Sequence, residues 1–422
     1  MNSLLSLVVI FLFTCGESLR VPRSSYSGRQ LLVGYWGQNR AGPANGHLNY
    51  EKPLLEVCQT TKYDILAVSY VVVFFDSRNK GMPAVNFAHH CDTAVSPEYP
   101  YLLRCPKIEK GIKECQGRGK KVIMSIGGET GDGTLTSPAK AKEFAHTLYN
   151  LFLGGSQYKD IRPFGSAIMD GIDMDIEGGG ADNYPGFIKE LRTLMDHDPN
   201  KKYLITGAPQ CRYPDHYLGP ETPGTALEAA GQFVDHLYIH FYNNYCQTGA
   251  GSLFKDTLKK WLEFSARTLP KGPLIFIGLP AASGAAASAQ YYRPPDELNA
   301  MYQSVKDLPG IGGIMLLDVS WDQNNVIDGQ RYSEYAFKVL GHITVPQTKA
   351  SSVPPNTAYT PSPTSPFSCT EVGDGFYPDP SADCNKYIEC RDGVMSSRSC
   401  AAELLFNPKI KTCDWSANVK CS

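Results

Sequence analysis

The chain has 422 residues, of which 42% are hydrophobic and 11% aromatic, and its formal net charge is −2. This length exceeds one small domain and predicts two or three domains. The near-neutral charge argues against a nucleic-acid-binding protein, which normally carries an excess of basic residues.

The N-terminus has the pattern of a secretory signal peptide. An apolar run from Leu4 to Phe13 is followed by the small residues Cys15, Gly16 and Ser18. The run is too short to cross a bilayer, which takes about 20 apolar residues. We therefore expect residues 1–18 to be removed, and the mature protein to be secreted, soluble and not bound to a membrane.

The cysteines also predict an oxidising compartment. Of the thirteen, Cys15 would leave with the signal peptide, and an even number remains. Six are scattered through the first 250 residues: Cys58, Cys91, Cys105, Cys115, Cys211 and Cys246. The other six are concentrated near the C-terminus: Cys369, Cys384, Cys390, Cys400, Cys413 and Cys421. This division indicates two separate modules.

Short apolar runs, typical of buried strands, recur along the first module. They span residues 30–36, 63–75, 120–128, 170–177, 202–210, 233–244, 273–281 and 311–321. Helical patterns lie between several of them, for example over 184–195, and over 137–152 with Ser137 as the N-cap and Pro138 at the first helical position.

Strands that alternate with helices pair in parallel through crossover connections. Eight such units favour a closed (β/α)8 TIM barrel over an open sheet. We therefore predict an α/β fold with a barrel over residues 30–342. Chemistry in such a barrel takes place at the C-terminal ends of the strands.

One of the predicted strands is unusually acidic. The sequence DGIDMDIEGGG, residues 170–180, places Asp173, Asp175 and Glu177 on one face, with apolar residues alternating on the other. In a barrel the apolar face would meet the helices and the acids would point inward. Like charges this close raise at least one pKa, giving a neutral acid beside an ionised carboxylate, as glycoside hydrolysis requires.

Two other interpretations of this strand remain. Calcium loops also alternate acidic residues, but they need a turn with polar or glycine spacers rather than Ile and Met. A purely structural acid cluster would be costly to bury without a basic partner, and none lies nearby in the sequence.

Together with further motifs, the acidic strand resembles family 18 of the glycoside hydrolases, and within it the hevamine-like chitinases. The matching segments are GYWGQN (34–39), SIGG (125–128), APQCRYPD (208–215), FYNN (241–244) and FIGLPAA (276–282). The resemblance implies substrate-assisted retaining catalysis. Glu177 would be the general acid and later the base, and Asp175 would hold the substrate acetamido group. Asp173 would share a proton with Asp175, and Tyr242 would bond the acetamido oxygen.

The resemblance also implies weaker sugar-binding candidates: Tyr35, Asn86, Gln210 and Asn243. Each has an alternative interpretation as barrel packing. The implied disulfides are Cys58–Cys115, Cys91–Cys105 and Cys211–Cys246. His89 and His90, which precede one half-cystine, would then be loop residues. No metal and no cofactor are implied.

The chain departs from the family pattern at two positions. Leu317 stands where most of the family has the Trp that forms the floor of the sugar site, and Trp321 follows four residues later. His240 stands where the plant enzymes have Gln. It would either titrate near neutrality and shift the pH profile, or be a neutral core residue.

After the barrel, residues 343–368 are rich in Pro, Ser and Thr and predict an extended linker. Residues 369–421 form the cysteine-rich module, too small to fold without covalent help. Its spacing and the phrases FYPDPSADCNKYIEC and LLFNPKIKTCDW resemble the peritrophin-type chitin-binding domain. The resemblance implies a small disulfide-rich β module with pairs Cys369–Cys390, Cys384–Cys421 and Cys400–Cys413. Its candidate sugar-stacking aromatics are Tyr377, Tyr387 and Trp415.

The sequence thus predicts a secreted chitinase, monomeric, that binds chitin and chito-oligosaccharides and no nucleic acid. Two alternatives remain open. Because Leu317 replaces the usual Trp, the chain could be a catalytically inactive chitin-binding lectin. The same chemistry could also serve another N-acetylglucosamine-containing glycan, although the C-terminal module favours chitin.

Overall fold

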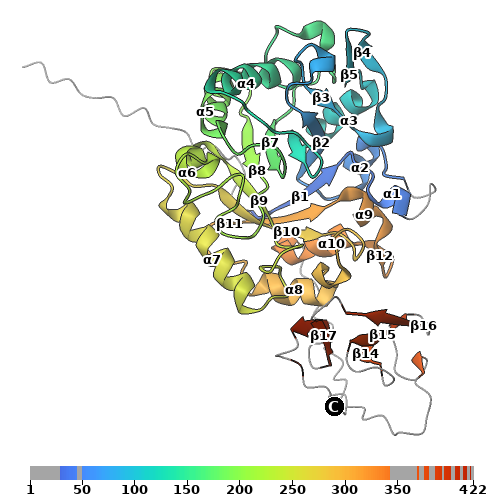
Figure 1. The fold of residues 1–422 in the computed structure, drawn as a ribbon. Helices are drawn as coiled ribbons and strands as arrows, with labels where there is room; N and C mark the ends of the chain where they lie inside the picture. Colours follow the sequence, from blue (N-terminus) through green and yellow to red (C-terminus); the bar gives the residue numbers. More distant parts are fainter. Residues whose placement is uncertain are drawn as a thin grey trace, which may run out of the picture. The chain divides into compact units, whose positions relative to one another are not determined.

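A computed structural model describes residues 29–44 and 50–342, and in the C-terminal module 368–369, 375–379, 385–391, 394–400, 404–408, 412–415 and 419. The chain divides into two compact units, Met1–Pro346 and Gln347–Ser422 (Figure 1). The expected signal peptide lies outside the described residues, as does the expected linker except for Ser368.

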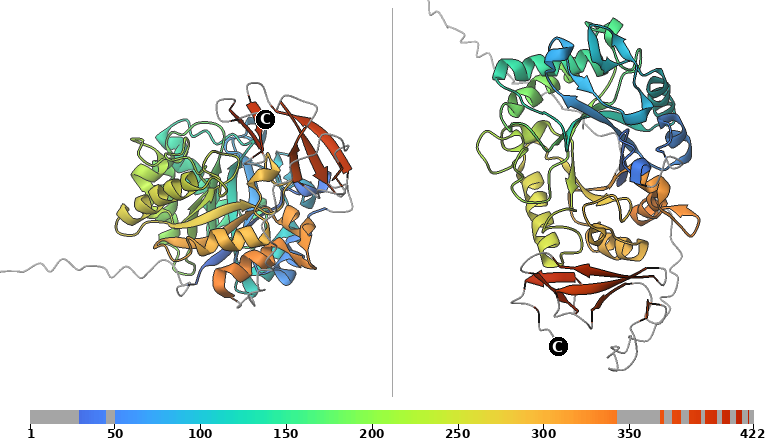
Figure 2. Two further views of the ribbon diagram at one scale, coloured as in Figure 1. Left: turned by 90° about the horizontal axis from the view of Figure 1, so that it is seen from below. Right: turned by 45° about the vertical axis from the view of Figure 1, so that its right-hand side comes forward.

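The first unit is a closed barrel of parallel strands, as predicted. Its strands are β1 (Leu31–Trp36), β2 (Ile65–Val73), β6 (Lys121–Gly128), β7 (Gly171–Ile176), β8 (Leu204–Gly207), β9 (His236–His240), β10 (Leu274–Pro280) and β11 (Ile311–Leu317). They pair in chain order, and β1 closes the ring by pairing with both β2 and β11 (Figures 1 and 2).

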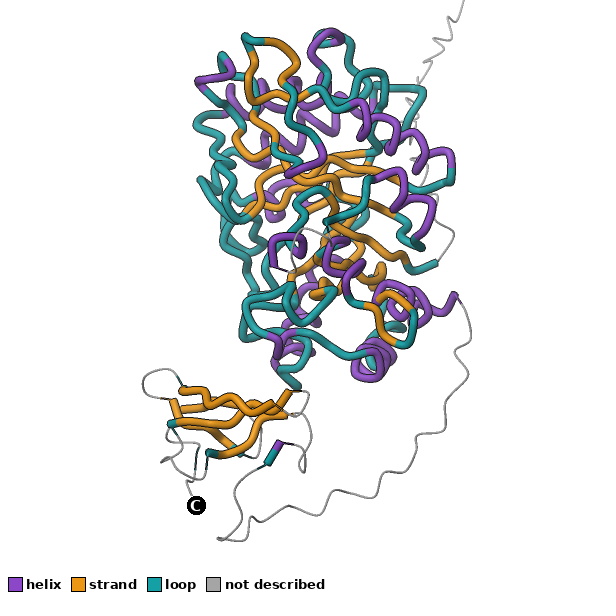
Figure 3. Tube along the Cα trace, turned by 90° about the vertical axis from the view of Figure 1, so that its right-hand side faces the viewer, coloured by secondary structure: helices purple, strands orange, loops and turns teal. Residues whose placement is uncertain are grey.

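Helices surround the strands (Figure 3). They are α1 (Ala41–Ala44), α2 (Leu54–Thr60), α3 (Pro106–Gly117), α4 (Pro138–Phe152), α5 (Tyr184–Asp196), α6 (Ala226–Ala230), α7 (Ser252–Arg267), α8 (Pro295–Gln303), α9 (Val319–Asn324) and α10 (Tyr332–Phe337). Short turns of helix add η2 (Ser77–Asn79), η3 (Ala88–His90), η4 (Lys159–Ile161), η5 (Gly231–Phe233), η6 (Ala289–Tyr291) and η7 (Lys338–His342). Minor strands are β3 (Ala84–Val85), β4 (Ala94–Ser96), β5 (Tyr99–Leu103), β12 (Val326–Ile327) and β13 (Gln330–Arg331).

The core has two layers, one outside and one inside the ring of strands, and the apolar residues of β7 belong to the outer layer. Ile172, Met174 and Ile176 pack between the sheet and the helices. The barrel interior holds a second cluster, which includes Tyr35 and Tyr242. Residues on alternate positions of a strand point to opposite faces. The acidic side chains of β7 therefore lie inside the barrel, as the alternation predicts.

The last predicted strand extends too far. We predict a strand to Trp321, but β11 ends at Leu317. The Asp318 side chain accepts a hydrogen bond from the Trp321 backbone N–H at 2.9 Å and caps α9. An aspartate at the N-cap favours the start of a helix. In the sequence, the apolar residues around Asp318 instead suggest that the strand continues.

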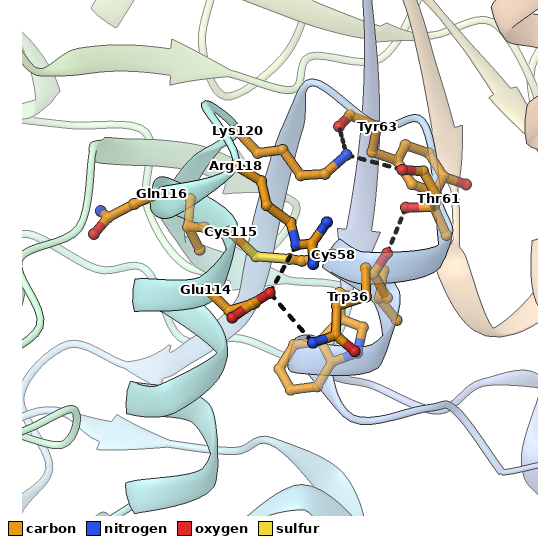
Figure 4. The surroundings of a disulfide bond; sticks show 12 residues. Trp36, Cys58, Thr61, Tyr63, Glu114, Cys115, Gln116, Arg118 and Lys120 are labelled. Carbon is orange, nitrogen blue, oxygen red and sulfur yellow. Dashed lines mark hydrogen bonds and ion pairs between the residues drawn. A yellow bond between two sulfur atoms is a disulfide. The ribbon is translucent and has the colours of Figure 1, made fainter.

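Three disulfides fasten the loops of the barrel unit. Cys58–Cys115 joins α2 to α3 (Figure 4), Cys91–Cys105 encloses the β4–β5 hairpin, and Cys211–Cys246 links the segments that follow β8 and β9. These are the pairs that the family resemblance implies. None of the helices among the described residues is both long and apolar enough to cross a membrane.

The C-terminal module consists of short antiparallel strands. β14 (Gly375–Pro378), β15 (Lys386–Arg391) and β16 (Val394–Ser399) form one sheet, and β17 (Leu404–Asn407) pairs with β18 (Thr412–Trp415). Cys369 is bonded to Cys390, and Cys400 is disulfide-bonded. The expected Cys384–Cys421 pair and the side chains of Cys413 and Trp415 lie outside the described residues.

Tyr377 and Tyr387 are half-buried in this module. The ring of Tyr387 stacks on that of Phe406 at a centroid distance of 5.0 Å.

Replacing the N-cap of α4 tests the local fold. The Ser137 hydroxyl accepts a hydrogen bond from the Lys140 backbone N–H at 3.2 Å. We expect Ser137→Ala to lower the free energy of unfolding in urea by about 1 kcal/mol, since a helix N–H loses its partner. Ser137→Thr keeps an acceptor oxygen and should lose far less. Equal losses in both variants would contradict the capping role.

Candidate active site

The acidic side chains of β7 differ in how deeply they lie. Asp173 is 0% and Asp175 2% exposed. Glu177 follows the last residue of the strand and is half-buried at the mouth of the barrel. The three carboxyls therefore run from the interior toward solvent along one strand face.

Asp173 is fully surrounded by hydroxyl donors. Ser125 of β6 and Thr206 of β8 stand beside it in register on the neighbouring strands. They donate hydrogen bonds of 2.7 and 2.6 Å, and the Tyr35 hydroxyl of β1 donates a third at 2.7 Å. Burial raises the pKa of Asp173, and these hydrogen bonds oppose the rise.

Asp175 is less well satisfied. Its Oδ2 accepts a hydrogen bond of 2.8 Å from the Tyr70 hydroxyl, while its buried Oδ1 has no hydrogen-bond partner among the described residues. The Nε2 of His240 lies 3.7 Å from that oxygen. Burial, followed by the charges of Glu177 and Asp173, raises the pKa of Asp175 well above its ordinary value.

Glu177 accepts one hydrogen bond, of 3.1 Å, from the Nε2 of Gln210. Burial and the nearby charge of Glu129 raise its pKa, while Arg40 and Gln210 lower it. The charge of Glu177 is one cause of the raised pKa of Asp175, so the two neighbouring carboxyls disfavour ionising together. The arrangement can supply a neutral acid beside a carboxylate.

Tyr242 and His240 complete this side of the barrel. Their rings stack with centroids 4.9 Å apart, and in the part of the chain that the structure describes the buried Tyr242 hydroxyl has no hydrogen-bond partner. Burial holds the pKa of His240 down at about 3. This favours the interpretation of His240 as an uncharged core residue over that of a group that titrates near neutral pH.

Glycine allows the backbone of β6 to approach Asp175. Gly127 is in register with Asp175 and has a φ of +101°, and a Cβ there would lie 2.3 Å from the Asp175 carbonyl oxygen. A side chain at this position would displace the acidic strand. The SIGG motif therefore has a packing function as well as supplying Ser125.

Three further sequence candidates have local structural contacts. Asn86 is exposed and accepts a hydrogen bond of 2.8 Å from the Ala88 backbone. Asn243 is exposed and accepts one of 2.8 Å from the Ala287 backbone. Leu317 is 9% exposed and belongs to the interior cluster.

Sequence reasoning missed several residues of the site: Tyr70, Ser125, Thr206, Arg40 and Asp318. Ser125 and Thr206 could have been found by aligning neighbouring strands at the level of Asp173. Tyr70 reaches Asp175 from a strand that is not its neighbour, and no local pattern signals such a contact.

The donor atoms of Asp175, Glu177 and His240 lie within 4.8 Å of one another, close enough to share a cation. A ligating carboxylate must be deprotonated, whereas the raised pKa values of both acids favour retention of a proton. The chemistry of this donor set therefore favours proton transfer over metal binding.

Comparison with known proteins identifies both units. The family profile described as Glycosyl hydrolases family 18 matches residues 31–340, and the profile described as Chitin binding Peritrophin-A domain matches residues 369–421. "Chitinase 3" from Candida albicans is 35% identical over 322 residues, covering 73% of this chain and 51% of the relative. The chain spans about half the length of the first curated relatives that it matches.

Among solved structures, a chitinase from Ipomoea carnea aligns with a TM-score of 0.59 at 27% identity, over 73% of this chain and 99% of that one. A xylanase and α-amylase inhibitor protein from Scadoxus multiflorus aligns with a TM-score of 0.58 at 28% identity, over 74% and 98% of the two chains. A similar barrel thus occurs in proteins that are named for different activities.

The neutral state of His240 predicts an acid-sensitive contribution to stability. Its pKa is about 3 in the folded protein and about 6.5 when unfolded, so as pH falls through this window only the unfolded chain gains the proton. We expect His240→Gln to reduce the loss of unfolding free energy between pH 6 and 4 by up to about 1.4 kcal/mol per pH unit. Denaturation in urea across this range measures it.

The matched control is His146→Gln on the exposed face of α4. If both variants keep the wild-type pH dependence, the buried imidazole of His240 is not the source of the acid sensitivity.

Proposed function

The chain belongs to family 18 of the glycosyl hydrolases, and we propose that it is a chitinase that cleaves β-1,4-linked N-acetylglucosamine chains with retention of anomeric configuration. One observation carries the proposal: an acidic residue at the barrel mouth, Glu177, stands next to a buried carboxyl, Asp175, with an unsatisfied oxygen. This geometry supports proton donation to a leaving oxygen beside a group that can bind an amide.

In the first step, Glu177 donates its proton to the glycosidic oxygen, and the bond from that oxygen to the anomeric carbon breaks. The carbonyl oxygen of the substrate's own acetamido group attacks the anomeric carbon and forms a ring. Asp175 accepts the amide N–H, which orients the carbonyl oxygen and stabilises the positive charge on the ring. The Tyr242 hydroxyl, without a protein partner, donates to the acetamido oxygen.

In the second step, the Glu177 carboxylate takes a proton from water, and the water oxygen attacks the anomeric carbon and opens the ring. Two inversions at the same carbon leave the β configuration. Asp173 shares a proton with Asp175, and three hydroxyls that donate to Asp173 fix its position. The raised pKa of Glu177 favours the protonated form that the first step needs.

The second unit supports chitin as the polymer. We propose that residues 369–421 bind insoluble chitin through Tyr377, Tyr387 and Trp415, that residues 343–368 are a tether, and that residues 1–18 direct secretion. A tether raises the local concentration of the barrel at the surface to which the module is bound. Twelve cysteines beyond the leader suit the extracellular space. The enzyme would act as a monomer, without cofactor, on chitin and its oligosaccharides.

A chitin-binding protein without hydrolytic activity is the second candidate. Two observations favour it: Leu317 in place of an aromatic floor, and the existence of a similar barrel named as an inhibitor. The retained set of Glu177, Asp175, Asp173 and Tyr242 favours the enzyme.

Hydrolysis of soluble chitotetraose separates these candidates. We expect the wild-type protein to release products that are initially β-anomers by proton NMR, and Glu177→Gln to lose at least about a thousandfold in rate, since one general acid contributes up to 10⁴-fold. Glu143→Gln, on the exposed face of α4, is the matched control. A folded wild type that binds the tetramer without turnover would establish the binding protein instead.

Removal of residues 368–422 tests the tethering role. The truncated barrel should lose most of its activity on solid chitin, because its concentration at the surface falls. Its rate on soluble oligosaccharides should remain within about twofold of wild type, as no new contact to a short chain is lost. A parallel loss on both substrates would show that the module supports the barrel itself.

A further inference from the structure

A second set of polar side chains lies at the C-terminal end of the barrel, apart from the acids of β7. It lies in a small pocket at the C-terminal ends of β1 and β11, beside β2. The lining residues are Tyr35, Trp36, Gln38, Arg40, Ser69, Tyr70, Leu317 and Asp318. Tyr35 bonds Asp173 and Tyr70 bonds Asp175, so the pocket adjoins the catalytic carboxyls.

Asp318 is the buried acid of this pocket, at 2% exposure. Its Oδ1 accepts hydrogen bonds from the Ser320 hydroxyl at 2.6 Å and the Trp321 backbone N–H at 2.9 Å. Within residues 29–44 and 50–342, no group donates to Oδ2. A buried carboxyl that uses half of its acceptor capacity costs stability. Helix capping accounts for Oδ1 alone, and Asp318 belongs to the lining of the pocket.

Burial and nearby charged side chains change the pKa of Asp318. Burial, and then the charge of Glu51, raises the pKa of Asp318 to about 7. Arg40 interacts favourably with Asp318, and its guanidinium lies 3.2 Å from Glu129. The wall of the pocket thus presents an acceptor and a cation, and beside them the aliphatic side chain of Leu317.

A leucine provides no aromatic face on which a pyranose ring can stack. Polar contacts next to Leu317 therefore gain weight in binding a sugar, and sugar hydroxyls are donors that suit a carboxyl oxygen. We infer that Asp318, through Oδ2, accepts a hydrogen bond from a hydroxyl of the bound N-acetylglucosamine chain and is a substrate-binding residue of this enzyme. The inference rests on the proposed function.

Calorimetric titration with chitotetraose tests this without turnover. The parent is Glu177→Gln, and the test variant adds Asp318→Asn, which keeps an Oδ1-like acceptor for the α9 cap but turns Oδ2 into a donor. We expect the dissociation constant to rise about tenfold, the equivalent of about 1.4 kcal/mol. In the active background, Asp318→Asn should raise KM about tenfold with kcat within about twofold.

The matched control is Asp322→Asn on the same helix. Asp322 is 0% exposed, outside the pocket lining, and both of its oxygens are satisfied, by Tyr63 and by the Ser333 backbone. It should lower the melting temperature and leave the dissociation constant unchanged.

Equal dissociation constants for the parent and the Asp318→Asn variant would overturn the inference and leave Asp318 as a helix cap. If the variant lost affinity for partially deacetylated oligomers alone, the occupant would be an ammonium group, and the hydroxyl contact would be wrong. A folded parent that fails to bind chitotetraose would overturn the proposed substrate, and the inference with it.

Discussion

The structure depends on burying two carboxyls of one strand inside a closed barrel. Moving a carboxylate out of water costs several kcal/mol unless it is protonated or hydrogen-bonded. The barrel compensates Asp173 by placing hydroxyls beside it in register on both neighbouring strands, Ser125 and Thr206, and a third across the interior, Tyr35. At this end of the acidic strand, both oxygens of Asp173 accept hydrogen bonds from the protein.

The carboxyls of the acidic strand accept fewer hydrogen bonds toward the mouth of the barrel, where the chemistry is expected. Asp175 has Gly127 rather than a donor as its neighbour on β6, so it depends on Tyr70 and keeps one oxygen without a partner. The Tyr242 hydroxyl is also buried and finds no hydrogen-bond partner within residues 29–44 and 50–342. Each such atom costs about 1–3 kcal/mol. A substrate acetamido group has both a donor and an acceptor, and it could satisfy both at once.

Much of this arrangement could be read from the sequence, because alternation along a strand is a local property. The inward acids, the outward Ile172 and Met174, and the order of the eight strands follow from runs of residues adjacent in the chain. Contacts across the barrel do not. The bond from Tyr70 to Asp175 spans 105 positions, and Asp318 lies in an apolar run that reads as strand, although its side chain caps a helix.

The presence of Leu317 in place of an aromatic floor, next to Asp318, changes which contacts can supply binding energy. A stacked aromatic binds any pyranose face without reference to its hydroxyls, whereas a carboxyl oxygen binds a hydroxyl at one position and orientation. The barrel of this chain would therefore gain selectivity in register along the polymer and lose general affinity for it. A module of different fold, with its own aromatic side chains, can restore the general affinity without restoring the floor, since an effective concentration in the mM range offsets a weak Michaelis complex. On this argument, the peritrophin-type unit would supply general affinity for the polymer, and the polar wall of the pocket would supply selectivity for the position of its hydroxyls.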